Sequence, residues 1–300
     1  MNLKIKIISL NILFAFSLSI NGQKNVNLKS PDGKVKLQIF PGDKVPGKTI
    51  AWFSLNAGNE KVLLLSSLEL ACNSLNPSIP FNILKTERIS VKNHWINNFG
   101  ERKDVPDNYN QVKILLQSSE LKINLICRAY NEGVAFAYEF PVQKGKDSVI
   151  ISDEKIVYKF PADYNTWSAA MAQAQYRHVP LSRIETGCER PLVIEYNDSL
   201  TIALAEAKMV DYARMKFEPD SSGGISIRSR LAGAVHKSFP FQSPWRVVMI
   251  GRNPGDLLEK NYLLLNLNDP SAISDISWIK PGKVRGNRWS FMSLQERLLK

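Results

Sequence analysis

The sequence predicts an all-β fold, and three observations lead to this expectation. Apolar and polar residues alternate with a period of two over many short segments. Turn-forming residues separate these segments about every 8–12 residues, and helical signals are few. The chain has 300 residues, of which 44% are hydrophobic. This is enough for one large β domain or two smaller ones, and it argues against disorder.

The first 22 residues have the layout of a secretory signal peptide. Lys4 and Lys6 form a basic start, and an apolar stretch follows over residues 7–20. Cleavage is expected near Gly22–Gln23. The stretch is too short and too polar in its flanks for a membrane span, and no cysteine follows it that would carry a lipid anchor. We therefore expect an exported, periplasmic protein.

The mature chain reads as a succession of strands and tight turns. It opens with a strand at 25–30, a Pro31-Asp32-Gly33 turn and a strand at 34–40, followed by a hairpin of 50–55 with 61–65. The segment RAYNEGVAFAYEFP predicts another hairpin, with Gly133 at the turn position that favours a positive φ. Further alternating segments lie at 81–95, 112–116, 121–130, 134–140, 151–160, 191–196, 201–205, 225–230 and 245–250.

Three segments depart from this pattern. Residues 99–110 are polar and rich in breakers, which predicts a loop: a solvated linker or a surface that meets another domain. Pro254 and Gly255 open a short predicted helix, although its second half is equally strand-like. Residues 167–176 are rich in alanine and remain unassigned. We expect a single domain over residues 23–283.

Composition excludes several classes of protein. The formal net charge is +11, but the lysines are scattered and no basic helix or stripe is present, so nucleic-acid binding is not expected. Three cysteines without a CxxC pair indicate neither a disulfide framework nor a zinc site, although one disulfide among them stays open and the sequence does not select a pair. Of these, Cys127 is expected in the core. The sequence contains no GxSxG, HExxH, P-loop or GxGxxG motif.

Isolated histidines and tryptophans add little to the search for a site. His94, His178 and His236 lack metal-ligand spacing and are expected to be structural or surface residues. Trp245 is expected to pack in the core. Trp278 lies near the end of the predicted domain, where an aromatic ring often packs on a following domain or on a sugar.

The main candidate for a functional side chain is Glu206, in TIALAEAKMVDYARMKF. Ile202 and Leu204 alternate with alanines, and a carboxylate follows between two further alanines. Such small neighbours would leave the carboxylate open to a metal ion or a sugar hydroxyl. The structural alternative is an edge-strand acid that pairs with Lys208 or Arg214.

Five blocks of the chain, in order and spacing, resemble one known family. They are GERKDVPDNYNQ (100–111), RAYNEGVAFAYEFP (128–141), ALAEAKMVDYARM (203–215), SPWRVVMIG (243–251) and NLNDPSAISDISWIKPGKV (266–284). Together they resemble the N-terminal domain of glycoside hydrolase family 97. The members are exported bacterial enzymes, typically α-glucosidases or α-galactosidases.

This resemblance implies a β-supersandwich similar to galactose mutarotase, packed on a catalytic (β/α)₈ barrel. It also implies an α-linked oligosaccharide as substrate, and a calcium ion near the active site that takes one glutamate from the N-terminal domain. Glu206, in LAEA, matches that ligand, and a carboxylate oxygen suits a hard cation. The other calcium ligands and the catalytic acid and base belong to the barrel, so no catalytic residue is assigned here.

The chain departs from the family pattern over residues 284–300, VRGNRWSFMSLQERLLK. This basic tail suggests a frameshift, a truncated gene or a gene-model error, or else a stand-alone domain with its own tail. The first interpretation is an N-terminal domain that is not catalytic by itself. The alternatives are a periplasmic carbohydrate-binding module and, less favoured, a mutarotase-like epimerase, for which no acid–base pair is evident.

Overall fold

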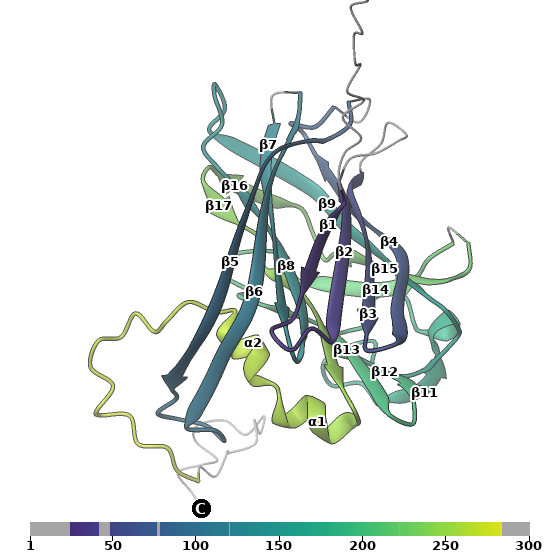
Figure 1. The fold of residues 1–300 in the computed structure, drawn as a ribbon, viewed down its shortest axis with the longest axis vertical. Coiled ribbons are helices and arrows are strands. Elements are labelled where there is room, and N and C mark those ends of the chain that lie inside the picture. The colour runs from purple at the N-terminus through teal and green to yellow at the C-terminus, as the bar shows by residue number, and fades with distance from the viewer. Residues whose placement is uncertain (1–24, 42–48, 77–78, 120, 222, 284–300) are drawn as a thin grey trace, which may run out of the picture.

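The computed structural model describes residues 25–41, 49–76, 79–119, 121–221 and 223–283. The predicted signal peptide (1–22) and the tail (284–300) lie outside these residues. Within them, two large antiparallel β-sheets stack on each other, as Figure 1 shows. The prediction of an all-β supersandwich is confirmed.

The first sheet, sheet A, contains the N-terminal strands and has eight strands among the described residues. In spatial order they are β1 (Val26–Lys29), β2 (Val35–Pro41), β3 (Thr49–Ala57), β4 (Glu60–Cys72), β9 (Ser148–Phe160), β15 (Ile225–Leu231) and β14 (Met215–Pro219), with β16 (Val235–Ser238) also paired to β9.

The second sheet, sheet B, has ten strands among the described residues. Their order is β11 (Arg177–Pro180), β10 (Asn165–Ser168), β12 (Leu192–Asn197), β13 (Leu200–Ala207), β18 (Trp245–Gly251), β8 (Gly133–Phe140), β7 (Leu121–Tyr130), β6 (Asp104–Ser118) and β5 (Asn82–Ile96), with β17 (Phe241–Gln242) on β8. A short 3₁₀ helix, η1, covers Leu181–Arg183.

The predicted turns form where glycine permits them. Gly133 has a φ of +147°, and a Cβ at this position would lie 2.2 Å from the carbonyl oxygen of Val248 on β18. Only glycine allows β8 to start so close to its neighbour. The hairpins β3–β4 and β7–β8 were both expected from the alternating pattern, and the register joins Tyr130 to Gly133 across the second turn.

The prediction of a loop over residues 99–110 is wrong for its second half. Asp104–Asn110 belongs to β6 and pairs with β5. Pro106 is tolerated because β7 reaches only as far as Tyr109, so at Pro106 the strand pairs on one side only. The unassigned segment 167–176 begins at the end of β10.

The predicted helix is confirmed as two short helices, α1 (Pro254–Glu259) and α2 (Tyr262–Asn266). Asn253 caps α1, because its side-chain oxygen accepts a 2.9 Å hydrogen bond from the backbone N–H of Asp256. Both helices lie against sheet B, where α1 contacts β18 and α2 contacts β6.

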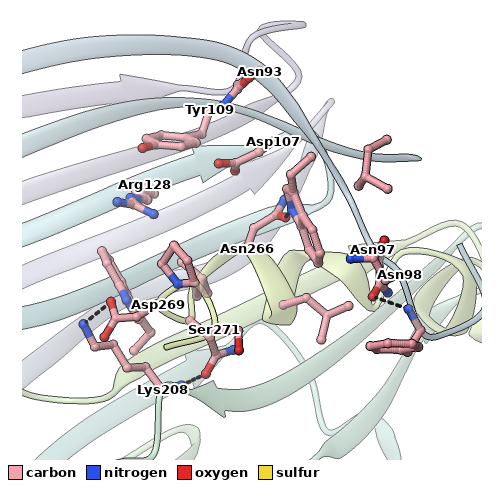
Figure 2. Close-up of a pocket in the computed structure, with 18 of the residues that line it drawn as sticks. Asn93, Asn97, Asn98, Asp107, Tyr109, Arg128, Lys208, Asn266, Asp269 and Ser271 are labelled. Atoms are coloured by element: carbon pink, nitrogen blue, oxygen red, sulfur yellow. Dashed lines mark hydrogen bonds and ion pairs between the residues drawn. The ribbon is translucent and has the colours of Figure 1, made fainter. Parts of the chain in front are cut away.

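Two clusters of buried apolar side chains hold the layers together. The larger cluster fills the space between the sheets and includes Phe53, Phe136 and Tyr158, together with Cys127 as predicted. The smaller cluster lies on the other face of sheet B, beneath α1 and α2, and includes Trp245. On this outer face α2 and the chain that follows it border a pocket, shown in Figure 2. No helix of the described residues is long and apolar enough to cross a membrane.

Candidate functional site

The structure places Glu206 in a buried position on a central strand, which corrects the expectation of an open carboxylate. Glu206 lies near the end of β13, between β12 and β18, and its side chain is only 2% exposed. It follows Ile202 and Leu204 in period two, so it points between the sheets, whereas the small alanines point to the outer face. Small neighbours in sequence therefore do not expose it.

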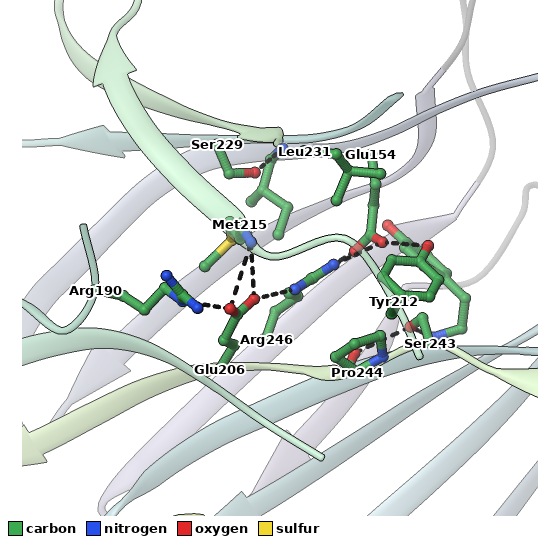
Figure 3. A network of polar contacts seen from close by, with 12 residues as sticks. Glu154, Arg190, Glu206, Tyr212, Met215, Ser229, Leu231, Ser243, Pro244 and Arg246 are labelled. Atoms are coloured by element: carbon green, nitrogen blue, oxygen red, sulfur yellow. Dashed lines mark hydrogen bonds and ion pairs between the residues drawn. The ribbon is translucent and has the colours of Figure 1, made fainter. Parts of the chain in front are cut away.

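Glu206 pairs with Arg246, which in turn binds a second buried glutamate, as Figure 3 shows. Arg246 Nη1 lies 2.6 Å from Glu206 Oε2, and Arg246 Nε and Nη2 donate to Glu154 Oε1 and Oε2 at 2.7 and 2.8 Å. The Tyr212 hydroxyl donates to Glu154 Oε2 at 2.9 Å. The Arg246 and Glu154 side chains are 1% and 0% exposed, so this pair is removed from water.

The outer side of Glu206 faces a second arginine. Arg190 Nε contacts Glu206 Oε1, and Arg190 Nη1 donates to Glu189 Oε2 at 2.7 Å. Glu189 also pairs with Lys216 at 2.9 Å and Arg214 at 3.2 Å. A continuous chain of alternating charges thus runs from Glu154 at the centre to Arg214, whose side chain is 48% exposed. We call these seven side chains, with Tyr212, the charge network.

Backbone contacts fix the two oxygens of Glu206 differently. The backbone N–H of Met215 donates to Glu206 Oε2 at 3.1 Å and is farther, at 3.4 Å, from Oε1. Oε2 therefore has two donors within 3.1 Å, the Met215 N–H and the guanidinium of the buried Arg246. Oε1 faces Arg190, whose side chain is 19% exposed. One oxygen is held inside, and the other lies toward the more accessible end of the network.

Titration in the network follows from this pairing. Burial alone would lower the pKa of the Arg246 guanidinium, but the carboxylates of Glu154 and Glu206 outweigh it and raise that pKa above its usual range. Burial, with Glu154 beside it, raises the pKa of the Tyr212 hydroxyl. For Glu189, burial would raise the pKa, but Lys216, Arg214 and Arg190 together lower it.

The network by itself does not fit a calcium ion. Calcium takes about six to eight oxygen ligands, yet both oxygens of Glu206 face guanidinium groups. In the part of the chain that the structure describes, no group of three or more His, Cys, Asp or Glu side chains could hold a metal ion. A cation at Glu206 would need ligands from elsewhere and the departure of Arg190.

The other residues singled out in the sequence are only partly gathered here. Arg214 joins the network through Glu189 and not through Glu206, and Lys208 pairs with Asp269 at 2.8 Å, so neither predicted partner of Glu206 is correct. Asp211 pairs with Lys237. His178 lies at the sheet edge, with Nε2 2.9 Å from Glu195 Oε2, and Trp278 is 68% exposed.

Sequence reasoning missed Arg246, Glu154 and Arg190. A signal existed for the first, because Arg246 is the single charged residue in the apolar strand WRVVMIG. Its period-two companions Val248 and Ile250 belong to the core between the sheets, so a buried arginine with an acidic partner was predictable. The identity of that partner depends on how the sheets stack.

Fold and network together define a β-supersandwich domain with a buried, fully paired charge network near the end of β13. Residues 28–270 match the family described as Glycosyl-hydrolase 97 N-terminal, and the chain belongs to this family.

Known relatives extend well beyond this chain. It is 24% identical to a retaining α-galactosidase of Bacteroides thetaiotaomicron, over 93% of this chain and 46% of that protein. It is also similar to a glycoside hydrolase family 97 enzyme of Pseudoalteromonas sp. strain K8, solved with acarbose and, as an E480Q variant, with panose. There the TM-score is 0.76 and the identity 27%, over 86% of this chain and 40% of that one.

A β-arabinopyranosidase shares the fold, with a TM-score of 0.67 at 19% identity over 76% of this chain. The chain spans less than half the length of the relatives named here.

Proposed function

We propose that this chain is the N-terminal domain of an exported family 97 glycosidase that acts on α-linked oligosaccharides. In this proposal the domain packs on a catalytic barrel and contributes Glu206 as one ligand of a calcium ion. Membership of the family supports it, as do the names of the relatives, an α-galactosidase and an enzyme solved with acarbose and panose. The basic and apolar segments of residues 1–22 support export.

The observation that carries the calcium part is the unequal setting of the two Glu206 oxygens. Arg246 and the Met215 N–H fix Oε2, which sets the orientation of the carboxylate. Oε1 faces Arg190, which is the more exposed of the two arginines. If Arg190 swings away, a cation can take its place beside Oε1 while Oε2 stays bound. Exchange of one positive group for another keeps the carboxylate compensated.

In this proposal hydrolysis belongs to the barrel. A glycosidase needs two carboxyl groups on either side of the scissile bond. The buried glutamates Glu154 and Glu206 are both held by Arg246 and do not face a common substrate space. We therefore expect the isolated chain to hydrolyse aryl α-glucosides and α-galactosides no faster than buffer. Turnover that survives purification and disappears when an acid of this chain is substituted would contradict this.

Calcium titration of the chain alone and of a chimera tests the role of Glu206. The chimera joins residues 25–283 to the catalytic part of the Bacteroides thetaiotaomicron α-galactosidase. The chain alone should bind calcium no more tightly than about millimolar, the weak end of protein sites. The chimera should bind it at least tenfold more tightly, and Glu206→Gln should remove this gain.

The matched control is Glu195→Gln, which changes an exposed glutamate of the same sheet and should leave the affinity of the chimera unchanged. Micromolar calcium binding by the chain alone, unaffected by Glu206→Gln, would show that the metal lies elsewhere.

A further inference from the structure

The outer face of sheet B carries a pocket of about 830 Å³, on the opposite side of the sheet from the charge network. Its walls come from β5, β6, β7, β17 and β18, from α2 and from the chain that follows α2. Small-molecule sites in proteins usually occupy about 300–1,000 Å³. The pocket is thus large enough for a small organic ligand.

Two buried polar atoms in this pocket have no hydrogen-bond partner among the described residues. They are Oδ1 of Asp107, an acceptor, and Nε2 of Gln242, a donor. Burial raises the pKa of the Asp107 carboxyl, and this rise is opposed by the nearby charge of Arg128 and by a hydrogen bond between this carboxyl and Tyr130. Buried polar atoms are nearly always paired in folded proteins, so two orphans of opposite kind in one pocket indicate a missing polar partner.

Aromatic side chains form a rigid wall beside these atoms. The Arg128 guanidinium lies over the rings of Tyr109 and Trp245, at 4.3 and 4.8 Å from their centroids. Its Nε donates to Gln111 Oε1 at 2.9 Å. Across the pocket, Trp95 Nε1 donates to Asn266 Oδ1 at 2.8 Å. A wall fixed in this way loses little conformational entropy when a ligand binds.

The charges that line the pocket favour a neutral ligand. Asp107 opposes an anion and Arg128 opposes a cation, while Lys208 is already paired with Asp269 at 2.8 Å. A hydroxyl group can donate to the Asp107 carboxylate and accept from the Gln242 amide. A pyranose ring offers several hydroxyls at its edge and C–H groups on its faces, which would pack against Trp95.

We propose that this pocket binds a neutral pyranose sugar, with Asp107 and Gln242 as hydrogen-bond partners of its hydroxyls. This site is separate from Glu206, and the proposal does not depend on the calcium role or on a barrel. It would give the domain a sugar contact of its own.

Binding is tested with the full chain and two neutral probes, methyl α-D-glucopyranoside and methyl α-D-galactopyranoside. Isothermal calorimetry and tryptophan fluorescence should show saturable binding of at least one probe. Glucuronate and glucosamine, which carry a negative and a positive charge, should bind at least tenfold more weakly. Asp107→Leu should weaken binding of the neutral probe at least tenfold, since the ligand then loses its acceptor.

Two further variants distinguish a binding role from a structural one. Gln242→Met should weaken binding at least threefold without lowering the free energy of unfolding, because Gln242 Nε2 has no hydrogen-bond partner to lose in the part of the chain that the structure describes. Trp167→Ala removes a half-exposed ring at the far edge of sheet B and should leave the affinity unchanged. The proposal is overturned if neither probe saturates, if Asp107→Leu binds as the parent does, or if Trp167→Ala abolishes binding.

Discussion

Trp245 and Arg246 are neighbours in sequence, yet they belong to two regions that differ in how their buried polar atoms are paired. On the inner face of sheet B, Arg246 holds Glu154 and Glu206 in a network whose charges are paired. On the outer face, Trp245 lines a pocket in which Asp107 and Gln242 each have a buried polar atom that no described residue pairs by a hydrogen bond. The network is closed to water, whereas the pocket is open to the surface at residues such as Ile96, which is 50% exposed.

This difference separates a structural polar cluster from a candidate binding site. The Arg246–Glu154 pair links the two sheets, and removal of one partner leaves the other charge buried without compensation. Unpaired buried atoms cost stability in the free protein and recover it when a ligand supplies the partner. We therefore expect substitutions in the network to act mainly on stability, and substitutions in the pocket mainly on binding.

The largest effect is expected at Arg246. Arg246→Met should lower the free energy of unfolding by about 3–5 kcal/mol, because it leaves the buried Glu154 without a positive partner and Glu206 with Arg190 alone. Trp245→Phe, one position away, keeps an aromatic ring on the other face and should cost about 1–2 kcal/mol. Urea unfolding measures both.

A second substitution sharpens this test. Glu154→Leu in the Arg246→Met background removes one of the stranded charges and should recover part of the loss. If Arg246→Met costs no more than Trp245→Phe, the inner network does not hold the sheets together.

A smaller effect is expected at Glu206. Glu206→Gln should cost about 1–3 kcal/mol, since the buried Arg246 loses one carboxylate and keeps the bidentate contact with Glu154. If the Glu206 carboxylate were open to solvent, as the sequence suggested, Glu206→Gln would leave the free energy of unfolding unchanged. Glu195→Gln is the control: this glutamate is 41% exposed beside His178, and the loss of an exposed pair should cost less than about 1 kcal/mol. Equal unfolding midpoints for Glu206→Gln and the parent would contradict the burial described here.

Alternation in the sequence predicted the sandwich because each strand buries one face, and this pattern needs no knowledge of partners. The same rule would have turned Glu206 inward, on the side of Ile202 and Leu204, but the small alanines around it suggested openness instead. Strand pairing over Asp104–Asn108 was hidden, because polar residues and Pro106 fit a segment that pairs on one side only. The partners Arg246 and Glu154 lie 92 residues apart. Their contact depends on sheet stacking, which a period-two pattern does not encode.

The smallest effect concerns Glu189, at the outer end of the network, and it depends on pH. Lys216, Arg214 and Arg190 lower the pKa of Glu189 in the folded chain, despite burial that acts the other way. In the unfolded chain a glutamate titrates near pH 4.3. The folded state therefore binds fewer protons, and Glu189 contributes its full stabilisation above about pH 5. This contribution is lost as the pH falls from there through the lowered pKa.

Glu189→Gln should thus destabilise the chain at pH 7. In urea unfolding, the difference in the free energy of unfolding between this variant and the parent should shrink at pH 4 and again at pH 3. Glu101→Gln, at an exposed position, serves as the control. It should not change the free energy of unfolding measurably at any of these pH values. A difference that stays constant over this range would mean that Glu189 acts through packing and not through its charge.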